Sequence, residues 1–204
     1  MTDRLTTTIR PARPEDRDAV ADLVYLTAGD AYDLFAGSRE AAVELIRAAF
    51  ERDGTDASRD VVTVAEVNGR VAGAMAAFPV AEGRDRSGRF LRMVLRMRPP
   101  WRWGGVLRLW WAGTRGGPRP PFDSLYVDAL ATHPEFRRRG IALALLDEAE
   151  RAARDRGLAQ VALDTAAGNT AARLLYERAG FVLTEERRAR GPIPALVGFA
   201  KRVA

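Results

Sequence analysis

The chain has 204 residues, of which 47% are hydrophobic and 29% are charged, a composition that favours one globular α/β domain spanning residues 1–204. It has no cysteine and one histidine, which excludes disulfide bonds, thiolate metal sites, cysteine nucleophiles and centres built from several histidines. The same counts lead us to expect no metal. We expect a cytoplasmic protein, because no apolar leader follows Met1 and no apolar run is long enough to span a membrane.

The net charge of +5 is distributed unevenly along the chain. Residues 84–119 contain ten arginines and one acid, so this segment carries +9 and the rest of the chain −4. All four tryptophans lie in the same segment. We therefore expect a mildly acidic body and one basic, tryptophan-rich insertion at about residues 82–121.

The body opens with a strand, two helices and a hairpin. Residues 6–10 alternate weakly, as a strand does, and a helical period follows them. Ser38 is a candidate N-cap for a second helix over residues 39–52. Residues 60–78 flank Asn68-Gly69, the dipeptide that a two-residue type I′ turn prefers, and so predict a hairpin.

After the insertion, strands and helices alternate. Alternation in the first of these strands places Tyr126 and Asp128 on one face and Leu125, Val127 and Ala129 on the other, unless a bulge intervenes. The element order predicts an α/β sandwich with a mixed sheet. The patterns predict strands at 124–131, 160–165, 181–185 and 196–200, and helices at 140–156 and 170–178.

The stretch from residue 125 to residue 146 carries the clearest chemical signal. A strand ends, Arg137, Arg138 and Arg139 follow in a short loop, and Gly140 opens a helix. Unpaired N–H groups and a partial positive charge at a helix N-terminus accept a phosphate, and glycine lets the backbone approach the anion. The segment predicts a phosphate site; the alternative is a solvated charge run.

Two linked motifs add a family resemblance. Arg-Arg-Arg-Gly-Ile-Ala at 137–142 resembles the Arg/Gln-x-x-Gly-x-Gly/Ala signature of the GNAT superfamily of acyl-CoA N-acyltransferases, and residues 126–136 look like the strand and loop before it. Asn169, Ala172 and residues 174–181 are similar to its second motif, and residues 8–16 to its opening. The resemblance implies a three-layer α/β/α sandwich around a mixed, mostly antiparallel sheet whose fourth and fifth strands splay apart.

The resemblance also implies acetyl-CoA as cosubstrate. Backbone amides of residues 138–142 would hold its pyrophosphate, and the exposed edge of the fourth strand would hydrogen-bond its pantetheine arm. An N–H group there, that of Leu130, would polarise the acetyl carbonyl. The implied contacts are Leu130, Ala131, Thr132, Arg137, Arg138, Arg139, Gly140, Ile141, Ala142 and Asn169.

Catalytic roles follow from the same resemblance. Tyr176 would donate a proton to the departing thiolate; the alternative is a core aromatic whose hydroxyl caps a backbone group. An amine acceptor must lose a proton before attack, and Asp128 is our candidate base, with Glu66 in reserve. Either acid could equally be a structural partner of an arginine, and we expect His133 in a surface loop.

We therefore expect direct transfer of an acetyl group to a primary amine of a small-molecule or peptide acceptor, in a ternary complex. The alternative is a non-catalytic acyl-CoA-binding module whose insertion mediates protein or membrane-surface association.

The insertion itself predicts a helical hairpin, because two amphipathic patterns flank Pro99-Pro100. Three roles stay open: its apolar side packs on the body, its tryptophans line an acceptor channel as a lid, or it contacts a membrane surface or a second copy of the chain. We do not expect nucleic acid as a partner, because no known reader motif accompanies the charge.

Overall fold

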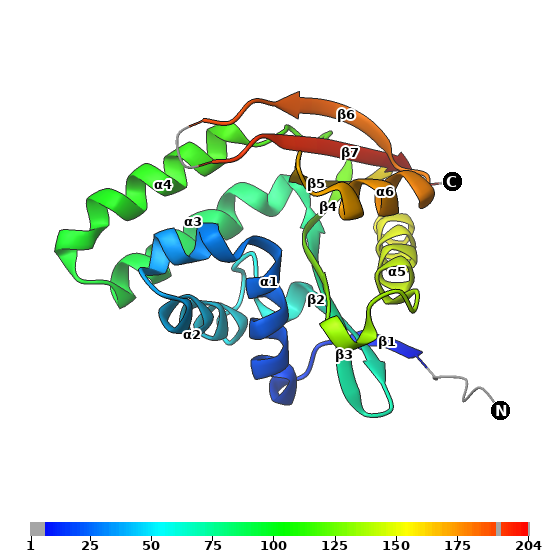
Figure 1. The fold of residues 1–204 in the computed structure, drawn as a ribbon, viewed down its shortest axis with the longest axis horizontal. Coiled ribbons are helices and arrows are strands. Elements are labelled where there is room, and N and C mark those ends of the chain that lie inside the picture. Colours follow the sequence, from blue (N-terminus) through cyan, green and yellow to red (C-terminus); the bar gives the residue numbers. More distant parts are fainter. Residues whose placement is uncertain (1–6, 191–192, 204) are drawn as a thin grey trace.

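The computed structural model describes residues 7–190 and 193–203. A seven-stranded sheet in the order β1-β2-β3-β4-β5-β7-β6 runs through it, with helices on both faces (Figure 1). Among the strands of the described residues, only the β4–β5 pair is parallel, so the sheet is mixed as predicted. The strands are β1 (Thr7–Pro11), β2 (Val62–Val67), β3 (Arg70–Pro79), β4 (Ser124–Thr132), β5 (Gln160–Ala166), β6 (Val182–Arg187) and β7 (Leu196–Arg202).

The helices predicted at residues 39–52, 140–156 and 170–178 are confirmed to within a few residues. Ser38 caps α2, since its hydroxyl oxygen accepts a 3.2 Å hydrogen bond from the backbone N–H of Ala41. The α-helices are α1 (Arg17–Ala36), α2 (Arg39–Phe50), α3 (Val80–Met97), α4 (Trp103–Gly116), α5 (Ile141–Asp155) and α6 (Thr170–Arg178). Short 3₁₀ helices are η1 (Pro14–Asp16), η2 (Arg59–Val61), η3 (Pro100–Arg102) and η4 (Pro134–Phe136).

The β2–β3 hairpin turns as its sequence predicts. Asn68 and Gly69 have φ angles of 50° and 76°, the left-handed conformation that both central residues of a type I′ turn require.

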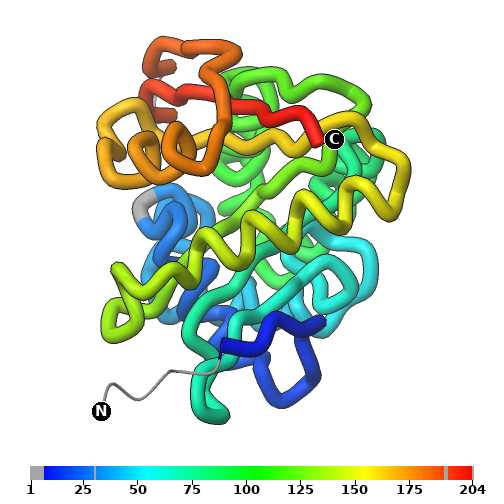
Figure 2. The backbone as a smooth tube through the Cα atoms, turned by 90° about the vertical axis from the view of Figure 1, so that its right-hand side faces the viewer, coloured from blue at the N-terminus to red at the C-terminus, as the bar shows by residue number. Residues whose placement is uncertain are grey.

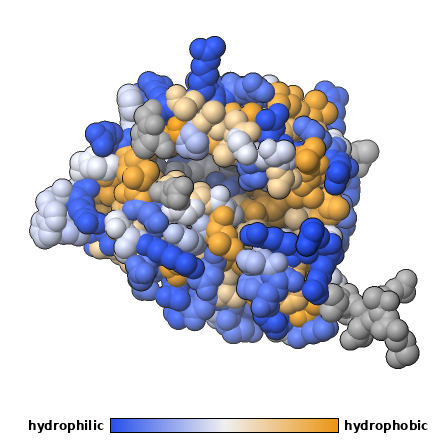
Figure 3. Space-filling view, in the orientation of Figure 1, coloured by the Kyte–Doolittle hydropathy of each residue, from blue (hydrophilic) through white to orange (hydrophobic). Residues whose placement is uncertain are grey.

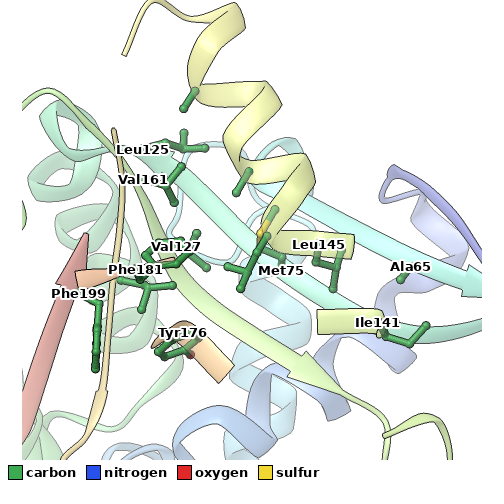
Figure 4. Packing of buried hydrophobic residues seen from close by; sticks show 14 of the residues in the cluster. Ala65, Met75, Leu125, Val127, Ile141, Leu145, Val161, Tyr176, Phe181 and Phe199 are labelled. Atoms are coloured by element: carbon green, nitrogen blue, oxygen red, sulfur yellow. The ribbon is translucent and has the colours of Figure 1, made fainter. Parts of the chain in front are cut away.

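The sheet separates two apolar cores. On one face, α5 crosses the strands (Figure 2) and packs Leu145 against Met75. Tyr176 of α6 lies in this core against Phe181 and Phe199 (Figure 4). On the opposite face, α1 and α2 cover a second core built from Val20, Leu23, Ile46, Val64 and Ala74.

A β-bulge at Asp128 makes β4 change face. Ala76 of β3 pairs with Ala129 and Ala77 with Val127, so Asp128 is an extra residue on β4. Val127 packs in the α5 core, whereas Ala129 packs in the α1–α2 core. Simple alternation, which placed Val127 and Ala129 on one face, is therefore wrong beyond Val127, because the extra residue reverses the side-chain phase.

The predicted helical hairpin consists of α3 and α4, which we call the α3–α4 hairpin. Its apolar side forms a third core with α1 and α2, where Leu45, Met93, Val94 and Val106 are buried together. Arg86 anchors its base: the buried guanidinium donates to Glu82, to the Thr55 carbonyl oxygen and to Asp60, at 2.8–3.0 Å. The structural role that the sequence left open is thus observed.

None of the helices in the described part of the chain is both long and apolar enough to cross a membrane.

Candidate functional site

The parallel strands β4 and β5 part halfway along their length. Residues 124–127 of β4 pair with residues 160–163 of β5, and the pairing then stops. Beyond these segments β4 keeps only its pairing with β3, at residues 129–132, and β5 keeps only its pairing with β7, at residues 164–166. The predicted splay is confirmed, and it leaves the facing edges of both strands without a strand partner among the described residues.

A cavity of about 810 Å³, which we call the fork cavity, opens between the parted strands. The side chains of α1 form its opposite wall, and α6 contributes Tyr176. Of the residues predicted to contact acetyl-CoA, those lining this cavity are Leu130, Ala131, Thr132, Arg137 and Asn169. Arg138, Arg139, Gly140, Ile141 and Ala142 do not line it; they form the loop and the first turn of α5 beside it.

The N-terminus of α5 is shaped for an anion. Gly140 occupies the N-cap position with a φ of 80° and Arg138 has a φ of 60°. Within the described part of the chain, no side chain caps this end of α5, so its first N–H groups lack a side-chain acceptor there. Because Arg137, Arg138 and Arg139 are all exposed around it, the end fits a phosphate oxygen.

A second cavity of about 900 Å³, the hairpin cavity, lies between the α3–α4 hairpin and the sheet. Trp110, Trp111, Phe78 and Tyr126 supply its aromatic lining. Asp128, Asp164 and Leu196 line both cavities, so the two meet where β4 and β5 part. The face of the molecule in Figure 3 is hollowed near its centre.

Three carboxyl groups face this meeting point. Asp128 is accessible from the cavities, but the protein around its carboxyl group raises its pKa well above the ordinary value, and the negative charges of Asp56 and Asp164 raise it further. Burial raises the pKa of Asp56 to about 7, against backbone N–H groups and the Arg86 charge that act to lower it. Burial also raises the pKa of Asp164, which accepts a hydrogen bond from Tyr126. The site therefore holds carboxyl groups that exchange protons closer to neutral pH than ordinary aspartates do.

Tyrosine hydroxyls accompany these acids. The Tyr176 ring is buried edge-on against Phe199, with ring centroids 5.7 Å apart. Burial, and then the Asp164 charge, raise the pKa of Tyr176 to about 12. Burial, followed by the charges of Asp164 and Asp128, raises the pKa of Tyr126 well above its usual range. Both phenols are proton donors, not anions, at neutral pH.

Three predicted polar residues have structural partners. Asn169 caps α6, its Oδ1 accepting from the Ala172 N–H at 3.2 Å, while it also lines the fork cavity. His133 caps η4 in a surface loop, as expected. Glu66, the reserve base, pairs with Arg10 at 2.7 Å and lines neither cavity, whereas Asp128 lines both.

Sequence reasoning missed Asp56 and Asp164. Asp164 carried a signal, because it directly follows Val161, Ala162 and Leu163, three buried apolar residues, and a charge beside them is costly unless it is paired. Asp56 lies in the loop between α2 and η2, and no pattern in the sequence marked it as a site residue. Its approach to Asp128 depends on how that loop packs.

Two of the four tryptophans contribute to the hairpin cavity. The Trp110 Nε1 donates to Ser87 Oγ at 3.0 Å, joining α4 to α3, and the Arg115 guanidinium lies 3.6 Å from the centroid of the Trp111 ring. Trp101, 84% exposed, and Trp103 lie outside it. The lining that the lid hypothesis requires is therefore present.

Comparison with known proteins gives a consistent result. The sequence model of the acetyltransferase (GNAT) family matches residues 29–181, and no curated protein matches the chain. Among solved structures, an N-acetyltransferase from Staphylococcus aureus Mu50 is 21% identical with a TM-score of 0.73, the match covering 95% of this chain and 100% of that one. A protein described as an acetyltransferase is 21% identical, with a TM-score of 0.68 and coverage of 97% and 100%. An agmatine N-acetyltransferase is 18% identical, with a TM-score of 0.58 and coverage of 96% and 99%. At these identities the structural matches show the fold.

Proposed function

This chain belongs to the GNAT family of acetyltransferases and is an acyltransferase enzyme, and from that premise we propose that it transfers an acetyl group from acetyl-CoA to a primary amine by direct transfer in a ternary complex. The observation that carries the proposal is the meeting of two cavities, of about 810 and 900 Å³, at Asp128 and Asp164. One cavity suits the cosubstrate and the other the acceptor.

The fork cavity is the proposed site of acetyl-CoA, which supplies the acetyl group as a thioester when bound. The unpaired edge of β4 at Leu130, Ala131 and Thr132 would hydrogen-bond the amide-bearing pantetheine arm as a neighbouring strand does. Support comes from Thr132, whose buried Oγ1 has no hydrogen-bond partner among the described residues. We place the carbonyl-polarising N–H at Leu130.

The N-terminus of α5 is the proposed pyrophosphate site. The anion would be bound by the backbone N–H groups of Arg138, Arg139, Gly140, Ile141 and Ala142. Arg137 and the neighbouring arginines would supply positive charge. Support comes from the positive φ of Gly140 and the uncapped first turn. Asn169 would contact the cosubstrate from the α6 side of the fork cavity.

Tyr176 and Asp128 are the proposed catalytic pair. A neutral phenol in the fork cavity can protonate the departing thiolate sulfur. Asp128 lines both cavities. A carboxylate with a raised pKa is a stronger base than an ordinary one, which suits removal of a proton from an ammonium group. The charges of Asp56 and Asp164 would help draw that cation in.

The test is an acceptor panel. Purified protein, acetyl-CoA and single amines are mixed, and released CoA is followed with a thiol reagent; the chain contains no cysteine, so it adds no thiol background. We expect CoA release that depends on the amine and an acetylated product by mass spectrometry. Acetyl-CoA binding by calorimetry without release for any amine would overturn catalysis and favour the non-catalytic acyl-CoA-binding module.

A further inference from the structure

The hairpin cavity carries a group of unpaired positive charges on one side. Arg84 of α3, Arg115 of α4 and Arg119, just after α4, all line it and are all exposed. Within the described ranges, none of the three forms an ion pair with a carboxylate. Arg86, close by on α3, is by contrast paired with Asp60 and Glu82. The chain thus neutralises the structural arginine and leaves the cavity-lining ones available.

Arg115 is held in an orientation that suits an oxyanion. Its guanidinium carbon stands 3.6 Å from the centroid of the Trp111 ring, so the planar group stacks on the indole. Stacking covers the faces of a guanidinium but leaves its N–H groups free at the edge, where they can hold a carboxylate or phosphate through two hydrogen bonds. Orientation by the indole also reduces the entropy lost on binding.

The same cavity also has an acidic part. Asp128 of β4, Asp164 of β5 and Asp56 of the loop between α2 and η2 line it, whereas the three arginines come from α3, α4 and the segment after α4. Phe78 and Tyr126 of the sheet and Trp110 of α4 add aromatic rings to its lining. A molecule in this cavity therefore meets negative charge from β4, β5 and the α2–η2 loop, positive charge from the hairpin, and aromatic surface from both the sheet and the hairpin.

We infer that the acceptor is a bipolar small molecule, with a primary amine at one end, a carboxylate or phosphate group at the other and an apolar body between. The inference rests on the proposed function, because it takes the hairpin cavity as the acceptor site. The amine enters among the three aspartates, and the oxyanion is bound by Arg115 with Arg84 and Arg119. A dication such as a diamine places its second charge against these arginines and is disfavoured.

The test compares acceptors that differ only at the far end. Four series of equal chain length are used: ω-aminoalkanoates, ω-aminoalkylphosphonates, n-alkylamines and α,ω-diamines. At the best length we expect kcat/KM for a carboxylate or phosphonate to exceed that of the matched alkylamine about 10- to 100-fold, and the two anionic series identify which oxyanion is recognised. Equal or better turnover of the alkylamines or diamines would overturn the inference while leaving the proposed function standing.

Arginine variants assign the effect to the cavity. Arg115→Gln should lower kcat/KM for the preferred anionic acceptor about 10-fold more than it lowers kcat/KM for the matched alkylamine. Arg108→Gln is the matched control, since Arg108 is exposed on the same helix and lines neither cavity; it should change neither. Equal losses on both acceptors, or the same loss in the control, would contradict a role in binding the anion.

A binding measurement tests this inference independently of the proposed function on which it rests. Calorimetric titration of the same amines into the wild-type protein and Arg115→Gln decides the question even where no acetyl group is transferred. Anionic amines that bind, and that lose affinity in Arg115→Gln, support the inference. Anionic amines that bind no better than the alkylamines refute it.

Discussion

The hydroxyl group of Tyr126 donates a 2.6 Å hydrogen bond to Oδ2 of Asp164, across the point where β4 and β5 part. Tyr126 pairs with Ala162 inside the last paired segment, whereas Asp164 is the first residue of β5 beyond it. A side-chain bond therefore continues the connection between the strands where the backbone ladder ends.

Removal of that donor should destabilise the fold in a pH-dependent way. Tyr126→Phe keeps the ring beside Phe78 but leaves the Asp164 carboxylate without this bond, which should lower the free energy of unfolding by about 1.5–3 kcal/mol near pH 8. The bond holds the Asp164 pKa down, so the loss should shrink at pH 5, where Asp164 is protonated more often. Urea titrations at the two pH values measure it; an equal loss at both would contradict the role of the charge.

Tyr176→Phe should separate turnover from cosubstrate binding. Loss of the proposed acid should lower kcat about 10²- to 10³-fold, while the dissociation constant of acetyl-CoA changes little, because the ring still packs on Phe181 and Phe199. Steady-state assays and calorimetry provide the two numbers. Full turnover in this variant would reassign the proton donor.

Asp128→Asn should lower kcat/KM about 10²-fold at neutral pH, because the proposed base is lost. The defect should diminish as the pH approaches the pKa of the amine, since the acceptor then arrives deprotonated. A pH profile of wild type and variant checks this recovery. A defect of constant size across the profile would indicate a structural role for Asp128.

Asp56→Asn should change how stability depends on pH. An acid with a higher pKa in the folded chain than in the unfolded one binds its proton more tightly when folded, so stability falls as the pH rises from about 4 to about 7. The variant lacks the Asp56 carboxyl group. Its unfolding free energy should therefore fall by about 1–2 kcal/mol less than that of the wild type between pH 5 and pH 8. Asp85→Asn, an exposed acid on α3, is the control and should parallel the wild type.

Gly140→Ala tests the backbone at the head of α5. A Cβ at Gly140 would meet nothing within 4 Å, yet the φ of 80° is unfavourable for alanine, so the unfolding free energy should fall by about 1–2 kcal/mol and acetyl-CoA should bind more weakly. Gly88→Ala in α3 also has open space and no such φ. Gly88→Ala should stabilise the protein slightly. Thermal melts of the two variants would then show that the loss in Gly140→Ala comes from its backbone conformation.

Much of the fold could be predicted from local signals: Ser38, Asn68-Gly69 and the apolar periods each act within a few residues. The bulge could not, since alternation around Asp128 is compatible with either face until the register with Ala76 is known. The same holds for the site. The motif around Gly140 is contiguous, whereas the cluster of Asp56, Asp128 and Asp164 is assembled by tertiary packing from three separate segments.

The bulge at Asp128 determines two things at once: the position of the Asp128 carboxylate, and which of the two cores each later residue of β4 faces. Replacing the Asp128 side chain changes a charge, but deleting the residue would turn every later side chain of β4 over, exchanging the sides of Leu130 and Ala131. One backbone irregularity thus encodes both where the carboxylate stands and which core each following residue fills. A substitution at this position can therefore be accommodated locally, whereas an insertion or deletion there would reverse the side chains of the rest of β4 and disrupt both cores.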